Sequence, residues 1–78
     1  MEYTVGQIVR AKAGRDKNGF FIIKDIDGQY AYIVNGKSRK VEFPKKKKLI
    51  HLAPTAVVVQ EFHTNREVVR ILSKFQDN

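Results

Sequence analysis

Cysteine is absent from this 78-residue sequence. The chain therefore has neither disulfide bonds nor thiolate metal ligands, and its hydrophobic core alone must stabilise the fold. A chain without cysteine also suits a reducing compartment.

Residues suited to catalysis are scarce. His51 and His63 are the only histidines, and no Ser or Thr is flanked by glycines as in a nucleophile elbow. Gly14 begins a basic loop, but the Gly-Lys-Ser/Thr of a phosphate-binding P-loop is missing, and the following residues 20–23 predict a strand. Two histidines with scattered carboxylates are a weak basis for a metal site. We expect no enzymatic activity, no cofactor and no small-molecule substrate, and we expect His51 to be an exposed strand residue.

Long apolar segments are also lacking. No stretch approaches the ~20 apolar residues that cross a bilayer, and residues 1–4 lack the basic start and apolar run of a secretion signal. These absences predict a cytoplasmic protein without a membrane partner.

What the sequence does contain is enough apolar material for one ordered domain. Hydrophobic residues make up 42% of the chain, and eight residues are aromatic. Because domains much smaller than ~100 residues bury only about 60% of their unfolded surface, there is room for one core and no second folded unit.

Positive charge is concentrated in one part of the chain. Residues 10–48 contain twelve Lys and Arg against four Asp and Glu, a local charge of +8, and the remaining residues sum to −1. Such a concentrated field suits phosphate binding, because each neutralised phosphate releases condensed counterions. The charge therefore predicts a nucleic-acid partner, with an acidic protein or membrane surface as alternatives.

Asx-Gly dipeptides predict tight turns at Asn18-Gly19, Asp27-Gly28 and Asn35-Gly36. The neighbouring apolar or β-branched segments predict strands over residues 6–12, 20–26 and 29–34. In the first of these, alternation places Val9 and Ala11 on one face and turns the basic Arg10 and Lys12 outward.

The rest of the chain predicts two more strands and a helix. Alternation favours a strand over residues 39–43, which Pro44 ends, and a short strand over residues 49–52 follows the four-lysine run. Thr64 to Glu67 has the form of a capping box, and Val68 and Leu72 follow at helical spacing. We expect a helix over residues 65–76 with Arg66, Arg70 and Lys74 facing solvent.

Five short strands favour a small closed antiparallel barrel, because closure removes exposed strand edges. The predicted fold is mostly β, with the barrel in residues 1–55, a connector in residues 56–63 and an amphipathic C-terminal α-helix in residues 64–78. The helix is expected to be packed on the barrel or appended to it, and its apolar stripe favours covering the barrel over recruiting a partner.

Two segments resemble a known family. Residues 6–23, GQIVRAKAGRDKNGFFII, resemble a KOW motif: a glycine-led strand, a basic loop containing Gly14, and an apolar strand. Residues 32–40 and 47–52 resemble KOW-containing large-subunit ribosomal proteins of archaea and eukaryotes. Residues 4–55 as a whole are similar to the short KOW-domain RNA-binding proteins of Gram-positive bacteria. The resemblance implies a five-stranded SH3-like barrel whose Gly14 loop contacts RNA.

Charge and resemblance together predict a monomeric RNA-binding protein of translation, associated with ribosomal RNA or ribosomal particles. It would use basic loops on phosphates, and its lysine excess implies little sequence specificity. The candidate RNA-binding residues are Arg10, Lys12, Gly14, Arg15, Lys17, Lys37, Arg39, Lys40, Lys45, Lys46, Lys47 and Lys48. The alternatives are an SH3-like module for an acidic protein partner and a transcription-associated KOW module.

Two features of the sequence allow more than one interpretation. The Lys45–Lys48 run fits a phosphate-binding loop, a solvated loop without function or a nuclear localisation signal. Tyr30 and Tyr32 share one strand face and could stack on bases, but cross-strand packing in a small barrel explains them at least as well.

Overall fold

Two loops determine the path of the first three strands. The computed structural model describes residues 2–75. β1 (Gln7–Ala11) leads through a loop to β2 (Phe20–Asp27), and a turn at Gly28 leads into β3 (Tyr30–Val34). Asp27 pairs with Tyr30, so the turn has two residues, and the φ of 62° at Gly28 is one that glycine adopts without steric cost. The three predicted strands are confirmed to within one residue at each end.

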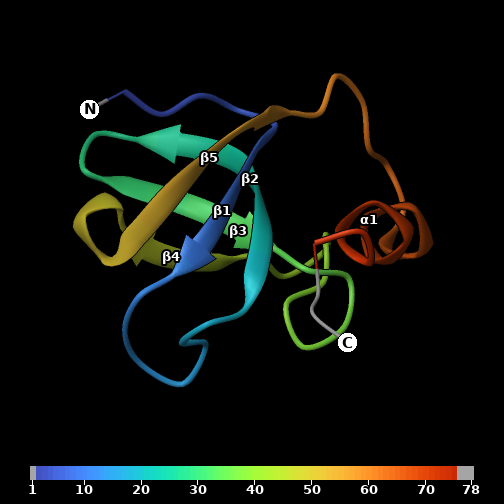
Figure 1. Ribbon diagram of the computed structural model, residues 1–78, viewed down its shortest axis with the longest axis horizontal. Helices are drawn as coiled ribbons and strands as arrows, with labels where there is room; N and C mark the ends of the chain where they lie inside the picture. The colour runs from blue at the N-terminus through green and yellow to red at the C-terminus, as the bar shows by residue number, and fades with distance from the viewer. Residues whose placement is uncertain (1, 76–78) are drawn as a thin grey trace.

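The sheet contains five antiparallel strands in the order β4-β3-β2-β1-β5 (Figure 1). β4 is Lys45–Lys48, the 3₁₀-helix η1 is Leu49–His51, β5 is Leu52–Val58, and the helix α1 is Asn65–Leu72. β4 pairs with β3 and β5 pairs with β1, so these two strands are the edges of a sheet that is not closed by pairing among residues 2–75. The predicted mostly β fold with a C-terminal helix is confirmed at this level.

The strand predicted over residues 39–43 is wrong. This segment forms a turn in which the Phe43 amide donates to the Lys40 carbonyl oxygen at 2.9 Å. Its alternation misleads because Val41 is buried in a cluster with residues of α1, whereas Phe43 is 80% exposed. Pro44 precedes a strand and does not end one.

The lysine run was predicted as a loop, and it is β4. A strand at a sheet edge forms through main-chain hydrogen bonds, which four lysines can supply as well as apolar residues can. The strand predicted over residues 49–52 is instead η1 followed by β5, and β5 continues to Val58. The connector is therefore shorter than predicted and starts after Val58.

Apolar side chains are buried on both faces of the sheet. On one face Val9, Phe21, Ile23 and Ile33 form a cluster with other buried residues of β1, β2, β3 and β5. On the opposite face the alternate residues Ile8, Ile22 and Val34 pack against Val68 and Leu72 of α1. Successive strand residues point to opposite faces, so continuous apolar runs such as that of β2 belong to a strand buried on both sides.

A capping box begins α1, as predicted. The Thr64 hydroxyl accepts from the Glu67 amide at 3.1 Å, and the Glu67 carboxylate accepts from the Thr64 amide at 3.0 Å and the His63 amide at 2.7 Å. The His63 and Thr64 amide bonds hold the pKa of Glu67 below its usual value. Their stabilising effect is therefore complete above the ordinary glutamate pKa and is lost as the pH falls through the lowered one.

The predicted helix over residues 65–76 is confirmed from Asn65 to Leu72, but residues 73–75 form a turn, so the helix ends earlier than predicted. Residue 76 of the predicted helix and the rest of the predicted C-terminal segment, residues 77–78, lie outside the described residues. Val68 and Leu72 are 0% and 2% exposed against the sheet. The apolar stripe of α1 thus covers the sheet. Within residues 2–75, no helix has the length and apolar character that crossing a bilayer requires.

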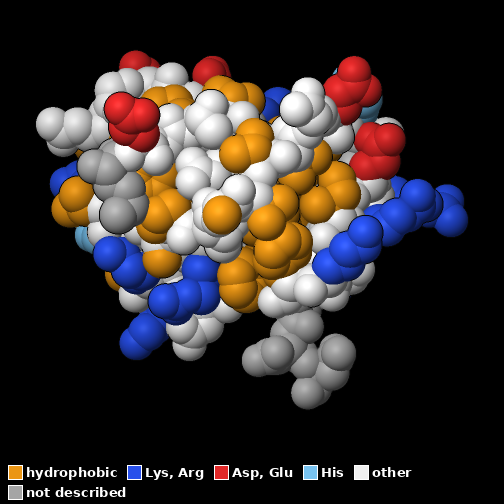
Figure 2. Space-filling view, turned by 45° about the horizontal axis from the view of Figure 1, so that its top comes forward, with side chains coloured by type: hydrophobic (Ala, Val, Ile, Leu, Met, Phe, Trp, Pro, Cys, Tyr) orange, Lys and Arg blue, Asp and Glu red, His pale blue; other side chains and the backbone are white. Residues whose placement is uncertain are grey.

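On one face of the molecule, most acidic and most basic side chains lie in different places. On the face drawn in Figure 2, carboxylates lie along the top of the view and near its right edge, Lys and Arg side chains lie below and at the sides, and hydrophobic side chains run between them. Val57 and Val58 at the end of β5 are 42% and 48% exposed. Scattered exposed apolar residues of this kind are common on soluble domains.

Replacing Leu72 by alanine tests the contribution of α1 to the fold. The substitution leaves a cavity between the helix and the sheet, and we expect it to lower the free energy of unfolding by about 2–5 kcal/mol. Urea denaturation followed by circular dichroism measures the change.

Val57→Ala is the matched control, because Val57 is already 42% exposed, and its effect should stay within about 0.5 kcal/mol. Equal effects of the two substitutions would contradict a structural role for α1.

Candidate nucleic-acid interface

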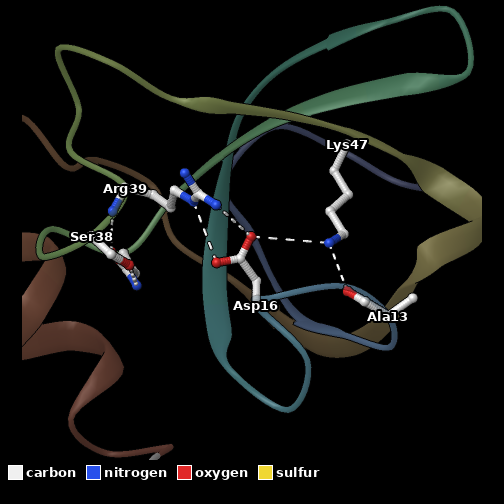
Figure 3. Close-up of polar contacts among 6 residues, drawn as sticks. Ala13, Asp16, Ser38, Arg39 and Lys47 are labelled. Carbon is white, nitrogen blue, oxygen red and sulfur yellow. Dashed lines mark hydrogen bonds and ion pairs between the residues drawn. The ribbon is translucent and has the colours of Figure 1, made fainter.

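Asp16 joins three segments of the chain (Figure 3). Its carboxylate accepts from Arg39 Nε at 3.3 Å and from Arg39 Nη2 at 3.1 Å. Lys47 Nζ lies 4.0 Å from the same carboxylate. The Asp16 side chain is only 9% exposed, so this ion pair lies mostly out of water. The 12–19 loop, the 35–44 loop and β4 are thereby held together.

Lys47 is a structural residue. Its side chain is 9% exposed, and its ammonium donates to the Ala13 carbonyl oxygen at 2.7 Å. The strand register explains why Lys47 is buried. Lys47 pairs with Ala31, so its side chain lies on the same face of the sheet as the buried Ala31. Lys46 and Lys48 pair with Tyr32 and Tyr30, so they lie on the opposite face. The lysine run therefore contributes its cations to two different faces.

Gly14 has the positive φ, +80°, that the expected loop glycine requires. A Cβ at this position would lie 3.1 Å from Lys47 Nζ, which is a tight contact. The Lys17 amide donates to the Gly14 carbonyl oxygen at 3.2 Å, and the Gly19 amide donates to that of Asp16 at 2.9 Å. These bonds give the 12–19 loop a defined shape and direct Arg15 and Lys17 into solvent.

The side chain of Asn35 shapes the second basic loop. Its Oδ1 accepts from the Lys37 amide at 2.9 Å and from the Arg39 amide at 2.8 Å. An Asx side chain that bonds nearby amides fixes a turn without sheet pairing. Lys37 and Lys40 are exposed on this turn.

The predicted RNA-binding cations divide into two groups. Arg39 and Lys47 are ion-paired to Asp16, Arg10 Nη1 donates to Asn18 Oδ1 at 3.1 Å, and Lys46 Nζ lies 4.5 Å from the Tyr30 ring centroid. The others are exposed, and their side chains make no hydrogen bond or ion pair with another residue between 2 and 75. They are Lys12, Arg15, Lys17, Lys37, Lys40, Lys45 and Lys48.

The tyrosine face is less open to stacking than the sequence suggests. Tyr30 and Tyr32 are half-buried, and Lys46 occupies a position over the Tyr30 ring. This cation–π contact already satisfies one face of that ring.

Four residues near this surface were not among the predicted site residues: Asp16, Lys24, Arg66 and Arg70. Asp16 carries the ion pairs but appears in the sequence as one acid among cations. Lys24 donates to the Val41 carbonyl oxygen at 2.6 Å, and Arg66 and Arg70 line a hollow with Gly36. Asp16 could have been noticed only because it is an acid directly between two basic residues, Arg15 and Lys17. His51 is exposed, as expected, although it lies in η1.

The described part of the chain holds no group of three or more His, Asp or Glu placed to bind a metal ion. Neither the models of known protein families nor the sequences of curated proteins match this chain.

Asp16→Ala tests the role of this carboxylate. The substitution leaves Arg39 and Lys47 without their acidic partner, and we expect the free energy of unfolding to fall by about 1.5–3 kcal/mol, the range for hydrogen bonds to charged groups. Thermal or urea denaturation measures it.

The comparison is Glu61→Ala. Glu61 lies 3.9 Å from His63, but both side chains are more than 70% exposed, so this substitution should change stability by no more than about 0.5 kcal/mol. The assignment fails if Asp16→Ala is as well tolerated as Glu61→Ala.

Proposed function

We propose that this chain is an RNA-binding protein that places the exposed cations of two loops on RNA phosphates. The observation that carries the proposal is the Asp16–Arg39 ion pair, which holds the 12–19 and 35–44 loops together. In Figure 1 both loops extend from the lower end of the view. Arg15 and Lys17 of the first loop and Lys37 and Lys40 of the second are exposed, so the ion pair joins two loops that each present cations to solvent.

The internal ion pairs strengthen this interpretation. Arg39 and Lys47 are already paired, so they fix the geometry while the remaining cations stay available to a ligand. Cations without internal carboxylate partners retain a field that attracts a polyanion. A bound phosphate would neutralise them and release counterions.

The resemblance to KOW domains supports the same function. A glycine-led β1, a basic loop with a positive φ at Gly14 and an apolar β2 follow one another as in that motif. Five short antiparallel strands, with η1 leading from one sheet edge to the other, are compatible with an SH3-like barrel. On this basis the proposed ligand is ribosomal RNA, and the proposed place of action is the cytoplasm.

The proposed recognition is weak in sequence specificity. All but one of the exposed predicted cations are lysines, which act as point charges without the bidentate geometry of arginine. Phosphate contacts position a protein on nucleic acid but carry no direct sequence information. We propose no catalytic role.

Replacing Lys17 and Lys37 by glutamine together tests the proposal with one cation from each loop. Removing two phosphate contacts should reduce the slope of log K against log salt by about 1.5 and weaken binding roughly tenfold at 0.1 M salt. The measurement is a salt titration against a ribosomal RNA fragment and against a random duplex RNA.

The matched control is the double substitution Lys46→Gln and Lys48→Gln. It removes the same charge from β4, on the face of the sheet that carries Tyr30 and Tyr32 of β3. We expect it to have a smaller effect. The proposed function fails if the unmodified protein does not bind RNA at low salt or binds with a slope near zero. Binding to an acidic protein, or co-purification with RNA polymerase, would then favour the alternatives.

Substituting all four residues of the lysine run would not answer this question. Lys47 Nζ contacts Ala13 and Asp16, so the quadruple variant would disturb the 12–19 loop together with the charge. The double variants avoid this position.

A further inference from the structure

A hollow of about 440 Å³ lies between α1 and the turn after β3. Gly36, Asn65, Arg66, Val69 and Arg70 line it. Two arginines one helical turn apart therefore border the same space, and Lys37 follows Gly36 in the chain. Nothing in the function proposed above uses these arginines.

We propose that this hollow is a second phosphate-binding site, in which Arg66 and Arg70 hold the backbone of the same RNA that the two loops bind. The inference rests on the proposed RNA-binding function and adds to it the position and chemistry of a separate contact. Arginine can form paired hydrogen bonds with a phosphate group, which the lysines of the loops cannot.

The hollow has a defined wall because of Gly36. Its φ is +80°, and a Cβ there would lie 2.5 Å from the Asn65 carbonyl oxygen and 2.8 Å from Val69 Cγ2. Cβ atoms essentially never make contacts this short, so only glycine lets the turn approach the helix backbone so closely.

Asn65 holds the other side of the turn. Its Oδ1 accepts from the Val41 amide at 2.8 Å, and its Nδ2 donates to Glu42 Oε1 at 2.9 Å. The bond from Asn65 is the main reason that the pKa of Glu42 is lowered. The Glu42 carboxylate is thus already hydrogen-bonded to the wall of the site.

The Glu42 and Glu67 carboxylates accept hydrogen bonds from amide groups. Neither Arg66 nor Arg70 forms an ion pair with an acid in the part of the chain that the structure describes. Glu67 lines a neighbouring hollow with Glu61, Ile71 and Arg70, so Arg70 borders both hollows, and the Glu67 carboxylate accepts from the His63 and Thr64 amides. Both arginines are exposed and available to an anion.

The hollow borders the first turn of α1, which begins at Asn65. The capping box occupies the Thr64 and Glu67 amides, so the ligand would be held by side chains. The hollow is also connected to the first interface, because Arg39 of the same 35–44 loop is paired to Asp16. An RNA backbone could therefore pass from the 12–19 loop over Lys37 to α1.

The test is the double substitution Arg66→Gln and Arg70→Gln in the full chain, titrated with salt against the ribosomal RNA fragment. The loss of two phosphate contacts should reduce the salt slope by about 1.5 and weaken binding roughly tenfold at 0.1 M salt. The midpoint of thermal unfolding should stay close to that of the unmodified protein, because both side chains are exposed.

Two further variants make the result specific. Arg66→Lys with Arg70→Lys keeps the charge and should keep the salt slope while losing part of the affinity, since the paired hydrogen bonds are lost. Lys46→Gln with Lys48→Gln removes equal charge from two residues that do not line the hollow and should weaken binding less.

The inference is overturned if the glutamine variant binds as tightly as the unmodified protein, or if its loss only equals that of the Lys46 and Lys48 variant. In either case the proposed function would still stand, since the loops would carry binding. Absence of RNA binding by the unmodified protein would instead remove the proposed function itself.

Discussion

The Asp16 carboxylate is the interaction on which the arrangement of this surface depends. It is one of four acids in the basic region of residues 10–48, and it is mostly buried between Arg39 and Lys47. Like-charged loops would otherwise repel one another, because Coulomb repulsion is strong where water is excluded. One carboxylate therefore allows two basic loops and a lysine-only strand to pack together. The positive net charge determines which ligands the surface attracts, whereas the negative charge of Asp16 determines how the two loops and β4 are arranged.

The cations of this chain accordingly have two kinds of role. Arg39, Lys47 and Lys24 satisfy carboxylate or carbonyl oxygens within the fold. Lys17, Lys37 and their exposed neighbours make no such contact among the described residues. A paired cation is held by several bonds, and its loss exposes unsatisfied partners, whereas an exposed lysine contributes little to stability. Composition alone treats all of these residues as equivalent.

Much of the fold could be predicted where local chemistry is decisive. The turn between β2 and β3, the alternation in β1 and the capping box at Thr64 each need only near neighbours, and all three predictions were confirmed. The two turn residues are Gly28 and Gln29, one position later than the predicted Asp27-Gly28. The failures lie where tertiary contacts decide. Val41 and Phe43 alternate like a strand, but α1 buries the first and leaves the second exposed, while four identical lysines carry no pattern that could reveal β4. For the site, charge located the basic region, but the partners of Asp16 and the hollow beside Arg66 depend on loop packing that residue spacing does not encode.

The pairing of β5 with β1 has a consequence for how the protein forms. It joins Ala11 to Leu52 and Gln7 to Val58, so the first strand is completed only when the last strand has been made. Ile8 of β1 and Ile22 of β2 likewise become buried only when α1 packs against them. Contacts between distant parts of a chain require loop closure first and slow folding. During synthesis on a ribosome, the basic loops would therefore emerge well before the sheet that orients them is finished.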